Sequence, residues 1–141
     1  LGEQPMSIVI TQPTNKHQAD KEQIDSMIAE AAKEFDGATF EVEGEVDTDQ
    51  TAFYKRGESR DDESSLIITL KITNQKTDER DEVECWGKIT TYPYDGQVEL
   101  SEDFFSKLVG KIPAWQIQAV CAEVKEYLED PENCFFQDID E

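Results

Sequence analysis

The chain has 141 residues, enough for one domain with its own hydrophobic core and few for two. Its 33 acidic residues outnumber 13 basic ones, and the formal net charge of -20 disfavours direct binding to nucleic acid or to anionic membranes. No apolar run approaches the roughly 20 residues of a membrane span. The negative charge attracts basic partners. The alternative explanation is that it only keeps the protein soluble.

The N-terminal segment, residues 1–12, is predicted to contain a short strand. Residues 7–11 (SIVIT) are mostly β-branched, and Pro13 is a natural end for an edge strand. Residues 1–5 are expected to lie ahead of a native start at Met6, and they carry no signal-peptide pattern. We therefore expect a cytoplasmic protein.

The first helix is predicted over residues 21–36. Asp20 and Gln23 form a capping-box pattern at its start, and Gly37 suits the position after its end. Apolar residues recur between them at helical spacing. They are Ile24, Met27, Ile28, Ala31 and Phe35.

Three alternating segments predict an antiparallel meander. They are residues 39–47, 66–72 and 83–91, and residues 51–54 (TAFY) are a possible extension. Residues 74–82 are charged and are predicted to be the loop of a hairpin. In the third segment Val83, Cys85 and Ile89 are expected on one face and Trp86 on the other.

Two helices are predicted near the C-terminus. Ser101 caps the first, which Gly110 ends, and Pro113 begins the second, which Asp130 and the following proline stop. The second helix is expected to bury one face, made of Ile117, Val120, Cys121, Val124 and Leu128. Residues 132–141 read as an acidic tail.

These elements predict a single two-layer α+β domain over residues 13–131. Its order is an N-terminal helix, a three- to four-stranded antiparallel meander and two C-terminal helices, with the helices covering the apolar face of the sheet. Many unrelated functions use such an arrangement, so topology alone does not identify a function.

Catalysis and cofactor binding are not expected. His17 is the only histidine and lies in a polar stretch, and no phosphate-binding or dinucleotide-binding motif occurs. Cys85 and Cys121 fit buried positions in a reducing compartment, and the cysteines lack zinc-ligand spacing. A calcium-like spacing occurs in Asp47, Asp49, Thr51 and Glu58, but Ala52 replaces the required glycine, and no metal site is predicted.

The most informative pattern is a row of carboxylates at every second position. The row comprises Glu41, Glu43, Glu45, Asp47 and Asp49. In a continuous strand they share one face, with neighbours roughly 6.6–6.8 Å apart, comparable to the gap between successive phosphates of a nucleic acid. Aligned like charges cost stability, which favours a functional role, whereas a plain solvent-facing strand is the alternative.

Two further acidic clusters are candidate partner-binding sites. One is Asp61, Asp62 and Glu63; the other is Glu129, Asp130, Glu132, Asp138 and Asp140. The second cluster also carries aromatic residues, so it fits a basic, partly apolar groove, although a solvated terminus explains it as well.

The function expected from these patterns is a non-enzymatic inhibitor that occupies the basic surface of a nucleic-acid-binding protein. Phage anti-defence proteins and immunity proteins against nuclease toxins use this type of nucleic-acid mimicry. The alternative is an acidic chaperone or assembly adaptor that shields an apolar segment of a client. Its candidate apolar contacts are Phe53, Tyr54, Trp86, Phe135 and Phe136.

Overall fold

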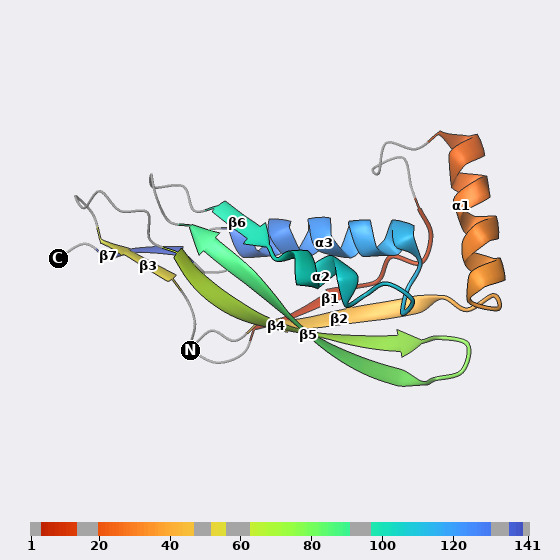
Figure 1. Ribbon diagram of the computed structural model, residues 1–141, viewed down its shortest axis with the longest axis horizontal. Helices are drawn as coiled ribbons and strands as arrows, with labels where there is room; N and C mark the ends of the chain where they lie inside the picture. The colour runs from red at the N-terminus through yellow and green to blue at the C-terminus, as the bar shows by residue number, and fades with distance from the viewer. Residues whose placement is uncertain are drawn as a thin grey trace.

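A five-stranded antiparallel sheet with two helices along one face forms the body of the protein (Figure 1). The structure is a computed structural model that describes residues 4–13, 20–46, 52–55, 63–90, 97–130 and 136–139. Its elements are β1 (Gln4–Ile8), α1 (Lys21–Glu34), β2 (Phe40–Val46), β3 (Ala52–Lys55), β4 (Glu63–Asn74), β5 (Arg80–Thr90), β6 (Gln97–Leu100), α2 (Glu102–Ser106), α3 (Ala114–Glu129) and β7 (Phe136–Ile139).

The α+β class is confirmed, and the predicted strand number and element order are wrong in detail. The sheet has the strand order β1-β2-β4-β5-β6, so it contains five strands, and a strand precedes the first helix. The N-terminal strand lies at residues 4–8, not 7–11, because Met6 and Ile8 point into the core whereas Val9 is 55% exposed. The strand β6 was not predicted, since four residues are too short to show a period.

The inner face of the sheet carries the core, as the alternation in β2 predicted. Phe40, Val42 and Val46 are buried, and Gly44 lies between them in the same row. A Cβ atom at Gly44 would lie 2.7 Å from Met6 Cε, so this position has room only for glycine unless Met6 moves. Strand β4 extends the same apolar surface with Ile68, Leu70 and Ile72.

Helices α2 and α3 lie on this inner face (Figure 1). The predicted apolar face of α3 is confirmed for Ile117, Val120, Val124 and Leu128, which are all buried, while Cys121 is only half-buried. The helix ends at Glu129 with Asp130 as its C-cap, as predicted. Ser101 precedes α2, but its hydroxyl donates to the carbonyl oxygen of Trp86 at 2.8 Å and does not cap the helix.

The hairpin between β4 and β5 is longer than predicted. Residues 80–82 belong to β5, and Thr73 is opposite Arg80, so only residues 75–79 form the turn. The charged residues 80–82, which were predicted to belong to the loop, lie instead at the exposed end of the paired strands β4 and β5. Backbone pairing thus extends beyond the apolar segment that identified each strand.

Helix α1 begins at its predicted capping box but does not cover the sheet. The Gln23 backbone N–H donates to Asp20 Oδ1 at 2.8 Å, and the Asp20 N–H donates to Gln23 Oε1 at 3.0 Å. Gly37 follows the helix with a φ of 76°. No residue of α1 is buried, and the helix stands at one end of the molecule, beyond the start of α3 (Figure 1). The prediction that all helices cover the sheet is wrong for α1.

A separate two-stranded sheet joins segments far apart in the chain. Strand β3 pairs with β7 in parallel, Ala52 opposite Phe136 and Lys55 opposite Ile139. The strand β3 matches the predicted extension at residues 51–54, while β7 lies within residues 132–141. Parallel pairing of remote segments has no local sequence signal.

Among the described residues Gln116 is the buried polar one, and it links α3 to β2 and to the segment after β1. Its Nε2 donates to the carbonyl oxygens of Ile10 and Phe40, both at 2.8 Å. Gln116→Leu is expected to lower the free energy of unfolding by about 1–3 kcal/mol, because both carbonyls lose their donor. Urea denaturation measures this, with Gln118→Leu at an exposed site of the same helix as the control. Equal stabilities of the two variants would contradict the role given to Gln116.

The thiols of Cys85 and Cys121 are expected to react slowly with alkylating reagents. Burial raises the pKa of each to about 11, from an ordinary 9.0. At pH 8 we expect iodoacetamide to label both about 100-fold more slowly than in the unfolded chain, as measured by peptide mapping. Because the folded pKa is the higher one, the stabilisation is complete below pH 9 and declines as the pH rises towards 11. Equal labelling rates in both states would refute the shielding.

Candidate functional site

The outer face of the sheet is the candidate functional site. Glu41, Glu43 and Glu45 alternate with the buried residues of β2 and lie on this face, as predicted. Both α2 and α3 lie on the other side of the sheet (Figure 1), and within the described ranges no helix or strand covers the outer face. The carboxylates of β2 are therefore presented to solvent or to a partner.

Strand β5 adds acidic residues to the same face. Glu82 and Glu84 are exposed and alternate with buried Val83 and Cys85, and Glu99 of β6 lies in the same outer rows. The register aligns Glu43 with Lys71 and Lys71 with Glu82, so a row of side chains crosses three strands. These glutamates were not among the predicted site residues, although the alternation around Val83 indicates that they lie on this face.

Lys71 of β4 lies between the acidic rows of β2 and β5. Its Nζ donates to Glu45 Oε1 at 2.7 Å, and their side chains are 46% and 27% exposed. The hydrogen bond to Glu45 raises the pKa of Lys71 above its ordinary value, and Glu82 and Glu43 act in the same direction. The row of carboxylates in β2 is thus partly neutralised by a cation from the neighbouring strand, which the sequence pattern did not show.

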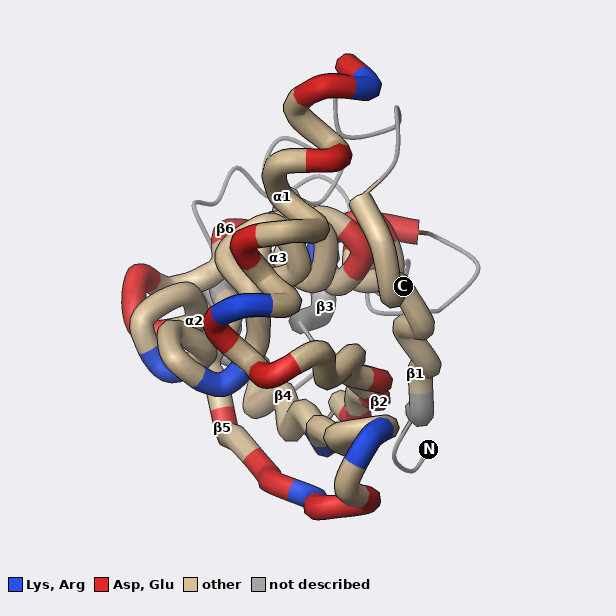
Figure 2. Tube along the Cα trace, turned by 90° about the vertical axis from the view of Figure 1, so that its right-hand side faces the viewer, with Lys and Arg blue, Asp and Glu red and all other residues tan. Residues whose placement is uncertain are grey.

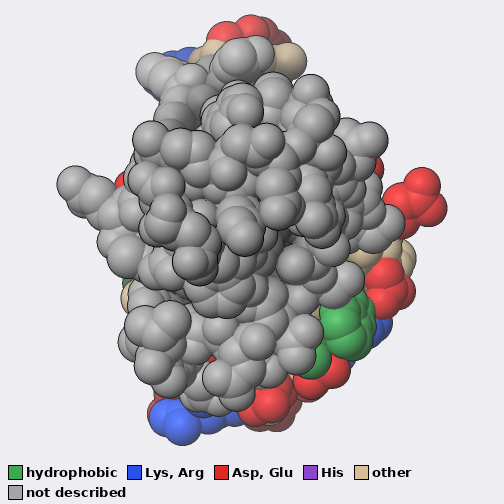
Figure 3. Space-filling view, turned by 90° about the vertical axis from the view of Figure 1, so that its left-hand side faces the viewer, with side chains coloured by type: hydrophobic (Ala, Val, Ile, Leu, Met, Phe, Trp, Pro, Cys, Tyr) green, Lys and Arg blue, Asp and Glu red, His purple; other side chains and the backbone are tan. Residues whose placement is uncertain are grey.

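The charged face also contains an apolar pair. Trp86 is 41% exposed and lies opposite Ile67 in the register of β5 and β4. Glu84 is two residues before Trp86 and shares its face. Figure 3 shows that the described surface includes an exposed hydrophobic patch next to acidic side chains. The outer face therefore combines carboxylates with an aromatic surface.

Of the other predicted acidic residues, those that the structure describes do not lie beside Glu41, Glu43 and Glu45. Glu129 and Asp130 lie at the C-terminal end of α3, in the helical layer, and Asp138 lies in β7 opposite Tyr54. Glu63 begins β4, at the end of the sheet far from Glu41. The remaining predicted residues lie outside the described ranges: Asp47, Asp49, Asp61, Asp62, Glu132 and Asp140.

Acidic residues lie along β5 and α1 in the described part of the chain, and basic residues lie between them near α2 (Figure 2). Across the described residues, no group of three or more histidine, cysteine, aspartate or glutamate side chains is placed to hold a metal ion. His17 and the calcium-like residues Asp47, Asp49, Thr51 and Glu58 lie outside them. No helix in the described ranges is long and apolar enough to cross a membrane.

Comparison with known proteins returned no match to a protein-family model, to a curated protein or to a solved structure. The function has to be inferred from the geometry.

Proposed function

We propose that the protein is a non-enzymatic acidic inhibitor that acts in the cytoplasm and occupies the basic nucleic-acid-binding surface of a partner protein. The observation that carries this proposal is the uncovered outer face, where Glu41, Glu43 and Glu45 lie across Lys71 from Glu82 and Glu84. Phage anti-defence proteins and immunity proteins are the settings to which this mode of inhibition belongs.

The spacing of the carboxylates supports mimicry of a phosphate backbone. Residues two apart in a strand are roughly 6.6–6.8 Å apart, and strands on either side of β4 are separated by about 9–10 Å. The face therefore presents two parallel rows of negative charge, as a nucleic acid does, at spacings of the same order. The net charge of -20 adds long-range attraction that accelerates association with a basic partner.

Trp86 gives this face an anchor that charge alone does not supply. Exposed tryptophans are enriched among the residues that dominate binding energy, and an indole ring attracts arginine and lysine through its face. With Glu84 beside it, Trp86 fits a guanidinium group of the partner. The acidic rows would then supply orientation, and Trp86 would slow dissociation.

The test is affinity capture from the native host at low salt, followed by elution in a salt gradient. The inhibitor proposal requires a basic nuclease or DNA-binding protein that elutes at moderate salt and whose nucleic-acid binding this protein blocks. Capture of a client that stays bound through high salt would instead support the acidic chaperone or adaptor, because apolar contacts resist salt. A captured nucleic-acid-binding protein that still binds its nucleic acid would refute the proposal.

A further inference from the structure

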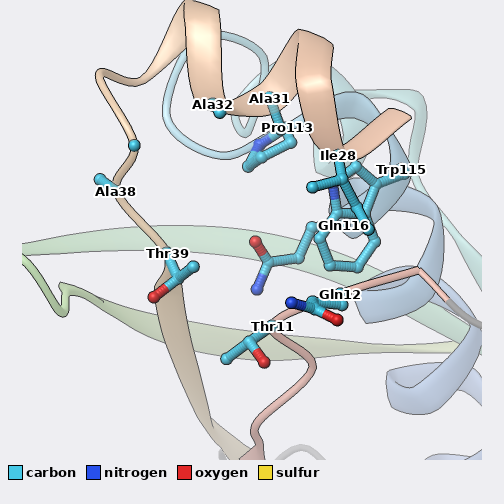
Figure 4. A pocket seen from close by; sticks show the side chains of 11 residues that line it. Thr11, Gln12, Ile28, Ala31, Ala32, Ala38, Thr39, Pro113, Trp115 and Gln116 are labelled. Carbon is cyan, nitrogen blue, oxygen red and sulfur yellow. The ribbon is translucent and has the colours of Figure 1, made fainter. Parts of the chain in front are cut away.

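A cavity of about 120 Å³ lies between α1 and the start of α3 (Figure 4). Four segments line it, and it opens to the surface: α1, the turn that follows it, the chain after β1, and the N-terminal end of α3. Its lining residues are Thr11, Gln12, Ile28, Ala31, Ala32, Gly37, Ala38, Thr39, Pro113, Trp115 and Gln116. The cavity lies where α1 stands beside the N-terminal end of α3 and away from the sheet (Figure 4).

The lining of the cavity is uncharged. One third of the residues in the chain are charged, yet none of the lining residues is. Ile28, Ala31, Ala32 and Ala38 supply an apolar wall, and side-chain hydroxyls and amides supply a polar one (Figure 4). Such a site favours a neutral ligand with an apolar body, since it offers no charged side chain to pair with an ion.

Two polar groups at the cavity have hydrogen-bonding capacity left over. Trp115 is 8% exposed, and its Nε1, which can only donate, is buried without a partner among the described residues. Gln116 uses Nε2 for the carbonyls of Ile10 and Phe40, which fixes its amide and leaves Oε1 on the cavity side (Figure 4). Native proteins seldom leave a buried donor unpaired, so Trp115 itself points to a missing acceptor.

We infer that this cavity binds a small uncharged amide. The carbonyl oxygen of the amide accepts the Trp115 Nε1 hydrogen, its N–H donates to Gln116 Oε1, and its apolar part lies on the alanines of α1. Helix α1 must shift slightly for the ligand to reach Nε1, and none of the residues of this helix is fully buried. This site is separate from the proposed inhibitory surface, and either can fail alone.

The probe is 2-methylpropanamide, titrated into ¹⁵N-labelled protein while the two indole Nε1–H resonances are followed; the Trp86→Phe variant assigns them. We expect a saturable shift at Trp115, none at Trp86, and none at either with 2-methylpropanoate, which has the same shape and a charge. Ala32→Leu, which fills the cavity from an exposed helical position, should weaken binding about tenfold or more. Ala29→Leu, exposed and outside the lining, should leave it unchanged.

Three results would overturn the inference. They are the absence of a saturable shift at Trp115, an equal response at Trp86, and equal binding by Ala32→Leu and Ala29→Leu. None of them bears on capture of a basic partner by the outer sheet face.

Discussion

Phe104→Ala is expected to lower the free energy of unfolding by about 3–5 kcal/mol, the usual cost of removing a fully buried phenylalanine from a core. Phe104 is 0% exposed and is among the largest fully buried side chains of the protein. It extends from α2, a helix of five residues that is too short to be stable without this contact. The loss therefore combines the transfer of the ring, an unfilled cavity and the release of α2.

Phe105→Ala is the matched control for this prediction. Phe105 is the next residue of the same short helix and is 43% exposed, so its truncation should cost less than about 1 kcal/mol. Urea denaturation followed by circular dichroism measures both variants. A difference between them of less than about 1 kcal/mol would mean that α2 does not anchor the core as the structure shows.

Neutralising the outer face is expected to weaken partner binding about 100-fold while leaving the fold intact. The variant carries Glu43→Gln, Glu82→Gln and Glu84→Gln, which keep the shapes of three exposed side chains. If each carboxylate contributes about 1 kcal/mol to the complex, the sum corresponds to about two powers of ten in Kd. Stability should change by less than about 1 kcal/mol, since lost attraction to Lys71 offsets relieved repulsion.

The control is a second triple variant with the same change in net charge, made on the helices and not on the outer face of the sheet. Glu30→Gln, Glu34→Gln and Glu126→Gln neutralise exposed residues of α1 and α3. Titration calorimetry against the captured partner at two salt concentrations compares the variants. If both triple variants lose the same affinity, net charge and not the sheet face controls binding, and the proposed surface is wrong.

Local residue patterns accounted for much of the fold. The capping box at Asp20 and Gln23, the alternation in β2 and, apart from half-buried Cys121, the buried face of α3 were predicted correctly. Each depends on residues within a few positions of one another, whose spacing directly sets which face is apolar. The placement of Glu41, Glu43 and Glu45 on one exposed face follows from the same rule.

The neighbours of those carboxylates across the sheet could not be predicted from local residue spacing. Lys71 is 26 positions away from Glu45 along the chain, and the two meet only because β4 lies next to β2. Gln116 is likewise 106 positions from Ile10, whose carbonyl it binds. Pairing of strands and docking of helices depend on how all the apolar faces pack together. A short segment of sequence does not specify this packing.

The sequence by itself determined the α+β class, the amphipathic faces and the excess of negative charge, because composition and short-range spacing control these properties. Only the tertiary structure decided that α1 stands off the sheet, that β3 pairs with β7, and that the uncovered face joins the glutamates of β2 and β5 around Lys71. The physical reason is that each of these features is a contact between distant segments, whose free energy exists only once the whole core has assembled.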